Sequence, residues 1–83
     1  MIDSKKRNEL KKLFKASLIA QHGKSNYAIR WHMDTERLFK YPTGLKGWMC
    51  FCTVSASDFK PTLYKFVYDI DDNYWKAYKQ NYG

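Results

Sequence analysis

The sequence predicts an α+β domain in which an N-terminal helix precedes a three- to four-stranded antiparallel sheet and a C-terminal helix follows it. An 83-residue chain has room for a single small domain, residues 1–83. Hydrophobic residues make up 45% of the chain, which is too many for a disordered basic tail. Apolar residues at helical spacing come first, and alternating segments with short links follow, which favours antiparallel pairing.

Residues 4–21 predict the first helix because they contain neither Gly nor Pro. Asp3 or Ser4 can cap its start, and Gly23 stands where a left-handed residue would end it. At 100° per residue, one broad side, mainly apolar, holds Leu10, Leu13, Phe14, Ser17, Leu18, Ala20 and Gln21. The opposite side holds Lys5, Asn8, Lys12 and Lys15, with Lys11 on a flank and Ile19 pointing with the lysines.

The middle of the chain alternates as strands do. In residues 27–33, one side would carry Tyr27, Ile29, Trp31 and Met33, and the other Ala28, Arg30 and His32. Residues 37–41 fit either a strand or one helical turn, and Pro42-Thr43-Gly44 indicates a turn. Residues 46–54 and 62–70 predict two further strands, separated by a loop from Ser55 to Pro61.

Asp71, Asp72 and Asn73 offer a cap for a last helix over about residues 73–82. Its aromatic residues exceed one helix face, and exposed Tyr and Trp favour interfaces. This helix could therefore form a protein interface or a homodimer contact through Tyr74, Trp75, Tyr78 and Tyr82. The alternative is that the tyrosines pack their rings on the core and keep their hydroxyls in water.

The positive charge is concentrated at one end of the chain. Fifteen Lys and Arg against eight Asp and Glu give a net charge of +7, and residues 1–46 hold eleven of the cations but only four of the acids. Such an asymmetry is typical of proteins that meet a polyanion, whether nucleic acid, an acidic protein face or anionic lipid.

The first helix is charged against its own dipole. It begins with Lys5, Lys6 and Arg7, and each cation at a positive helix end costs about 0.3–1 kcal/mol at low salt. Only Asp3 and Glu9 offset them. A phosphate-binding face would explain a pattern that weakens the helix, and an ordinary solvated face is the alternative.

A second element is consistent with the same hypothesis. Arg30 and His32 share the outward side of one predicted strand, and Met49 and Phe51 share one side of another. Basic and flat side chains on a sheet can form a stacking platform for unpaired bases. The alternative, favoured for Met49 and Phe51, is that a helix covers them as core. For Arg30 the platform is favoured, because a buried Arg needs a partner.

The predicted order of elements is similar to that of double-stranded-RNA-binding domains. Those domains carry a basic patch at the start of the last helix, where this chain has Asp71-Asp72-Asn73. Their lysine-rich signature is also absent, so the resemblance assigns no residues.

The sequence favours neither catalysis nor a metal or cofactor. Cys50 and Cys52, with His22 and His32 upstream, lack zinc-finger spacing, and we expect both cysteines to be reduced core residues. Asp69-x-Asp71-Asp72 lacks the Gly and the closing Glu of a calcium loop. No nucleophile motif stands out, so we expect a protein that is not an enzyme.

We therefore expect a small basic protein that binds nucleic acid, most readily RNA or single strands. The residues expected to hold it are Lys5, Lys6, Lys11, Lys12, Lys15, Lys24, Arg30 and His32. The alternative is a phage- or mobile-element-type inhibitor or adaptor that binds a host nuclease, toxin or defence system through a basic and aromatic surface, with or without RNA. The charged N-terminus and the absence of a long apolar run predict a cytoplasmic protein with no membrane span.

Overall fold

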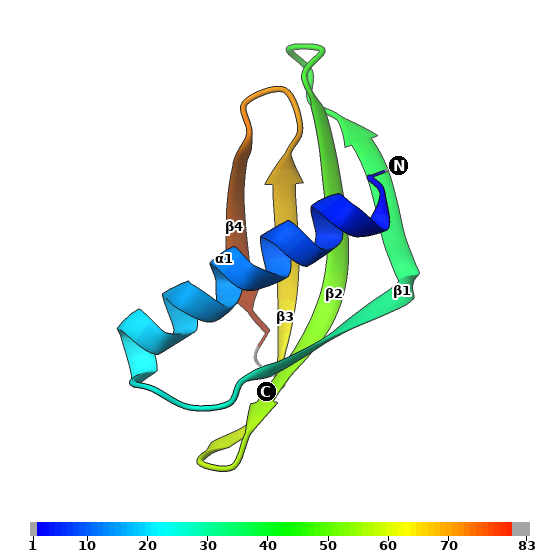
Figure 1. The fold of residues 1–83 in the computed structure, drawn as a ribbon. Coiled ribbons are helices and arrows are strands. Elements are labelled where there is room, and N and C mark those ends of the chain that lie inside the picture. The colour runs from blue at the N-terminus through cyan, green and yellow to red at the C-terminus, as the bar shows by residue number, and fades with distance from the viewer. Residues whose placement is uncertain (1, 81–83) are drawn as a thin grey trace.

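A computed structural model describes residues 2–80 and has one helix and four strands there. The elements are α1 (Ser4–His22), β1 (Ala28–Lys40), β2 (Lys46–Ala56), β3 (Phe59–Asp69) and β4 (Tyr74–Lys79). The strands pair in chain order, β1-β2-β3-β4, and every pair is antiparallel. Figure 1 shows α1 lying obliquely across one face of this sheet. The predicted α+β class and N-terminal helix are confirmed, and the sheet has four strands.

Both predicted ends of α1 are confirmed. The Asp3 side chain accepts a hydrogen bond from the Lys6 backbone N–H at 2.8 Å, which satisfies one of the free donors of the first turn. Gly23 adopts φ = 92°, and its N–H donates to the Ile19 carbonyl at 2.9 Å. Because this backbone conformation is strained for residues with a Cβ, glycine ends the helix at low cost.

The core lies between α1 and the sheet. Leu10, Phe14 and Leu18 are the buried residues of α1, one turn apart on its inner side. They face alternate residues of the strands, and the buried hydrophobic residues of the sheet are Ile29, Trp48, Cys50, Cys52, Val54, Tyr64, Phe66 and Tyr68. Tyr27, directly before β1, is buried as well. Rings dominate the contact: Phe66 stacks on Trp75 at 5.2 Å between centroids, and Phe14 meets Tyr64 edge-on at 5.3 Å.

β1 continues through the segment whose structure the sequence left open. Residues 37–40 pair with β2, so this part is strand. Between His32 and Arg37 the register shifts, which accommodates extra residues on the β1 side. Within this irregularity the Trp48 indole N–H donates to Glu36 Oε1 at 2.9 Å, so the buried ring keeps a polar partner. Met33, predicted to face inward with Trp31, is 41% exposed there.

The predicted C-terminal helix is wrong, because residues 74–79 form the edge strand β4. Alternation explains the difference: Trp75 and Ala77 pack on the core, whereas Tyr74, Lys76 and Tyr78 are exposed. The polar residues before them form a turn and do not cap a helix. Asn73 has φ = 50°, and its Oδ1 accepts from the Tyr68 hydroxyl at 2.8 Å.

The predicted loop from Ser55 to Pro61 is also wrong. β2 extends to Ala56 and β3 begins at Phe59, which leaves Ser57 and Asp58 as the turn. The pairing register shifts between Val54 and Ala56, so the polar residue Ser55 lies at an irregularity of the strand pair and not in a loop. Pro61 is tolerated within β3 close to this turn, where pairing is irregular.

Candidate nucleic-acid interface

The lysines of α1 form a line on its outer side. Lys5, Asn8, Lys12 and Lys15 follow one another at intervals of three and four residues, which places them on one side of a helix. We call these four residues the lysine stripe. It lies away from buried Leu10, Phe14 and Leu18, and Lys5 and Lys12 are exposed. Ile19 continues the stripe and is 42% exposed, as predicted.

The stripe cations have no carboxylate partner within residues 2–80, where the one salt bridge joins Lys6 to Glu9. At about 1.5 Å per residue, the stripe spans roughly 15 Å from Lys5 to Lys15. Successive phosphates of a stacked helical strand advance about 3.4 Å along the helix axis, so a stripe of this length lies alongside about four or five of them. Lys11 flanks the stripe on the side nearer the core.

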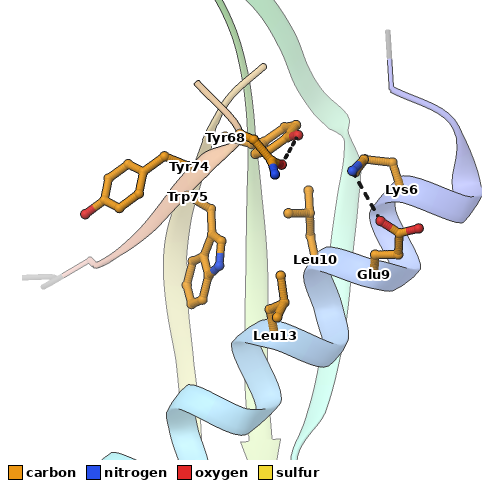
Figure 2. Close-up of a pocket in the computed structure, with 8 residues that line it drawn as sticks. Lys6, Glu9, Leu10, Leu13, Tyr68, Tyr74 and Trp75 are labelled. Carbon is orange, nitrogen blue, oxygen red and sulfur yellow. Dashed lines mark hydrogen bonds and ion pairs between the residues drawn. The ribbon is translucent and has the colours of Figure 1, made fainter. Parts of the chain in front are cut away.

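Two of the three leading cations of α1 are engaged within the fold. Figure 2 shows Lys6 pointing to Glu9, with 3.2 Å between Nζ and Oε2. The Lys6 ammonium also lies 5.6 Å from the centroid of the Tyr68 ring. The Glu9 carboxylate and this ring hold the pKa of Lys6 above its usual value. Arg7 donates to the Ile2 carbonyl at 3.2 Å. These contacts explain part of the charge pattern, and Lys6 lies outside the stripe.

The structure does not bring Arg30 and His32 to the helix lysines. Directly paired residues of an antiparallel ladder share a face, and Arg30 pairs with Thr53 while His32 pairs with Phe51. α1 covers the other face, on which Trp48, Cys50 and Cys52 are buried. The predicted phosphate contacts therefore divide between two sides of the molecule. Lys24 is exposed in the connection from α1 to β1.

We call the side of the sheet away from α1 the open face. No element within residues 2–80 covers it, and its central residues are half-buried or exposed: Arg30, His32, Phe51, Lys65, Lys76 and Tyr78. Sequence reasoning favoured Phe51 and Met49 as core covered by a helix, and that prediction is wrong, since α1 packs on the opposite face. It also missed Lys65, Lys76 and their neighbours. Alternation within each strand predicts that these lysines point away from the core, but only the pairing register of the strands places them near Phe51.

The predicted aromatic interface is also divided. Tyr74 and Tyr78 are 53% and 47% exposed on β4, whereas Trp75 points to the core and stacks on Phe66. Tyr82 lies outside the described residues. Beside β4, a hollow of about 470 Å³ is lined by Leu13, Trp75 and Tyr74, with Lys6, Glu9 and Asn73 at its polar end (Figure 2).

Cys50 and Cys52 are free thiols and fully buried in the core. Burial raises the pKa of the Cys52 thiol to about 12, and it raises that of Cys50 in the same direction. Such thiols are poor nucleophiles and poor metal ligands near neutral pH. No group of three or more His, Cys, Asp or Glu side chains is placed to hold a metal ion within the part of the chain that the structure describes.

Comparison with protein-family models, with curated proteins and with solved structures gives no match for this chain. The order α-β-β-β-β also differs from the order that resembled double-stranded-RNA-binding domains. Within residues 2–80, no helix combines the length and the apolar character that crossing a membrane requires.

Proposed function

We propose that this protein binds nucleic acid, with RNA or another single strand as its preferred form, through phosphate contacts along α1. The observation that carries the proposal is the lysine stripe: three cations on one side of a helix, without carboxylate partners, over a length that matches several phosphates. Lys11 adds a fourth cation on its flank. Asn8 lies within the stripe and can donate an amide hydrogen bond to a phosphate oxygen.

Charge placement supports the proposal over an ordinary solvated helix. Solvated helices commonly place acids at the start, where the dipole favours them. Beyond the N-cap Asp3, the first turn of α1 carries no acid. Lys5 is exposed there, so its charge opposes the dipole without a compensating contact within residues 2–80. An anionic partner supplies the missing compensation.

Salt-dependent binding tests the proposal. The protein would be titrated into a dye-labelled single-stranded RNA of about 12 nucleotides, within the usual range of site sizes, and anisotropy recorded at several salt concentrations. Each phosphate contact to a single strand contributes about −0.7 to the slope of log K against log salt. The triple variant Lys5→Gln/Lys12→Gln/Lys15→Gln should lose about 2 from the slope and roughly 100-fold in affinity at ~0.1 M salt.

A matched control removes the same charge elsewhere. Lys40, Lys46 and Lys60 are exposed and lie outside both the stripe and the open face. The variant Lys40→Gln/Lys46→Gln/Lys60→Gln should keep most of the slope. Equal losses in the two triple variants would mean that net charge, and not the stripe, holds the strand. Absence of binding by the unmodified protein at ~50 mM salt would contradict the proposal altogether.

A second candidate function is binding to a host protein as an inhibitor or adaptor. Its support is β4, an edge strand on which Tyr74 and Tyr78 are exposed. Tyr74 also lines the hollow together with Leu13, itself 52% exposed. An edge strand can pair with an extended segment of a partner. A homodimer through β4 is less favoured because Lys76 and Lys79 would approach their own copies. A partner captured from lysate that survives both nuclease and high salt would support this candidate over nucleic-acid binding.

A further inference from the structure

The open face brings together residues from all four strands. His32 of β1 pairs with Phe51 of β2, Phe51 with Lys65 of β3, and Lys65 with Tyr78 of β4. Side chains of directly paired residues lie about 4.5–5.5 Å apart at Cβ. The four therefore form a continuous row across the sheet in which rings alternate with basic groups. Strand register creates this row, since its members are spread over 47 positions of the sequence from His32 to Tyr78.

The rings of this row are accessible. Phe51 is half-buried at the centre of the sheet, and Tyr78 on the edge strand is 47% exposed. Within residues 2–80 neither ring has an aromatic contact with the core, in contrast to Trp75 and Phe66, which stack on the covered side. An apolar ring in a sheet surface offers its flat side to a second flat group. Such stacking contributes about 1–3 kcal/mol per nucleic-acid base.

The charge around the row favours an anionic occupant. Arg30, Lys65 and Lys76 occupy paired positions of this face and have no salt-bridge partner within residues 2–80. Asp69 is an acid on the same face, and its Oδ1 accepts a hydrogen bond from the Tyr41 hydroxyl. A second copy of the chain on this face would place its own cations close to these, and the like charges would repel each other. A single strand of nucleic acid supplies bases that can stack on the rings and phosphates that can bind the cations.

We infer that the open face is a base-stacking surface for single-stranded nucleic acid, with Phe51 and Tyr78 as stacking rings and Arg30, Lys65 and Lys76 as phosphate contacts. This inference rests on the proposed function and extends it to a second surface, on the side of the sheet opposite the lysine stripe. It also sets the substrate class. Bases within a duplex keep their faces stacked on one another, so only unpaired bases can lie on these rings.

The two surfaces are separated by the thickness of the molecule, whose shortest extent is 21 Å. Arg30 belongs to β1, an edge strand of the sheet. A nucleic-acid strand that runs round this edge, from the lysine stripe to the row of residues on the open face, would pass Arg30. A strand of about 12 nucleotides is roughly 40 Å long when its bases are stacked, so it is long enough to contact both surfaces at once.

An oligonucleotide without bases separates stacking from phosphate contact. The unmodified protein would be titrated with an oligothymidylate of about 12 nucleotides and with an abasic strand of equal length and charge. We expect the abasic strand to bind at least 10-fold more weakly, with a similar salt slope. Equal affinity for the two strands would overturn the stacking inference and leave phosphate binding by α1 intact. Binding of neither strand at ~50 mM salt would refute the proposed function itself.

Variants that remove or keep the ring localise the effect. Phe51→Leu and Tyr78→Leu should each lower affinity for the oligothymidylate by about 5- to 100-fold, with little change for the abasic strand. Phe51→Tyr and Tyr78→Phe keep a ring and should retain binding within a few-fold. Circular dichroism would establish that each variant is folded. If the Leu variants bind the oligothymidylate as the Phe and Tyr controls do, the stacking surface lies elsewhere.

Discussion

The covered and open faces of the sheet are formed by alternate residues of the same four strands, but their chemistry differs. The covered face carries fully buried residues such as Trp48, Cys52 and Phe66, all closed off by α1. The open face carries Arg30, Lys65 and Tyr78, and no element within residues 2–80 packs on it. One face therefore holds the fold together, and the other is available for a partner. The lysine stripe is the second available surface, on the far side of α1.

The comparison explains why so small a chain has fifteen aromatic residues. A domain of this size buries only about 60–65% of the surface that its unfolded chain exposes, so its core cannot use them all. Rings of the covered face pack within about 5–6 Å of each other, as Trp31, Phe66 and Trp75 do. Those of the open face, such as Phe51 and Tyr78, are partly or largely exposed.

Truncating one ring on each face should give the largest difference in stability. Phe66→Ala removes a fully buried ring that contacts Phe14, Trp31 and Trp75, so the free energy of unfolding should fall by about 3–5 kcal/mol. Phe51→Ala should cost only about 1 kcal/mol, because its ring is already partly in water. Urea unfolding followed by circular dichroism measures both. Similar losses would show that the open face is part of the core.

Alkaline pH should lower the free energy of unfolding through two groups, the Cys52 thiol on the covered face and the Tyr41 phenol outside the core. The folded pKa values of Cys52, from burial, and Tyr41, from its hydrogen bond to Asp69, are both raised to about 12. A raised folded pKa means that the protonated form stabilises the fold. Each contribution is therefore complete below the unfolded pKa, about 8.5–9 for the thiol and 10 for the phenol, and is lost as pH rises through 12.

Unfolding titrations between pH 8 and 12 would test this with Cys52→Ala and Tyr41→Phe. We expect Cys52→Ala to flatten the fall in stability more than Tyr41→Phe, because the thiol is buried and the phenol is near solvent. A wild-type slope unchanged in Cys52→Ala would show that this thiol does not stay protonated in the folded protein.

Gly47 tests how the open face is organised at its end. The Phe39 ring lies so close to Gly47 that a Cβ at this position would clash with the ring. Gly47→Ala should therefore displace Phe39, with a cost of about 1 kcal/mol, because a surface ring can move aside. Since Phe39 also packs edge-on against Tyr41, the tyrosine fluorescence should change. A fully stable variant with unaltered fluorescence would mean that Phe39 does not rest on the glycine.

The smallest effect should come from Lys5, and its sign is informative. Lys5→Gln removes a cation from the positive end of α1, so stability should rise by about 0.3–1 kcal/mol at low salt. The same change should reduce the salt slope for single-strand binding by about 0.7. Increased stability with weaker binding would identify Lys5 as a residue kept for function. A loss of stability would instead assign Lys5 a structural role.

Much of the fold is readable from local patterns. Asp3, Gly23 and the turns of Leu10, Phe14 and Leu18 predict α1 almost to the residue, because caps and helical spacing are local signals. Period-two alternation likewise predicts β2 and β3. Residues 74–79 misled the prediction because Asp71 and Asp72 suit a helix cap, whereas pairing with β3 decides the structure.

The candidate site is harder to predict, because it depends on how distant segments are paired. Alternation places Arg30 and His32 on one face of a strand but does not say which face α1 covers. The row from His32 to Tyr78 exists only once the register of three strand pairs is known. The lysine stripe was predictable in full, since one helix carries it.

Amide NMR of the protein during titration with a single-stranded oligonucleotide would show whether both surfaces bind, because it reports every contacted residue at once. Binding to both surfaces predicts shifts along the lysine stripe and at Arg30, Phe51, Lys65 and Tyr78, with little change at the turn of residues 42–44. Shifts confined to that turn and to the hollow beside β4, or no shifts at low salt, would contradict it.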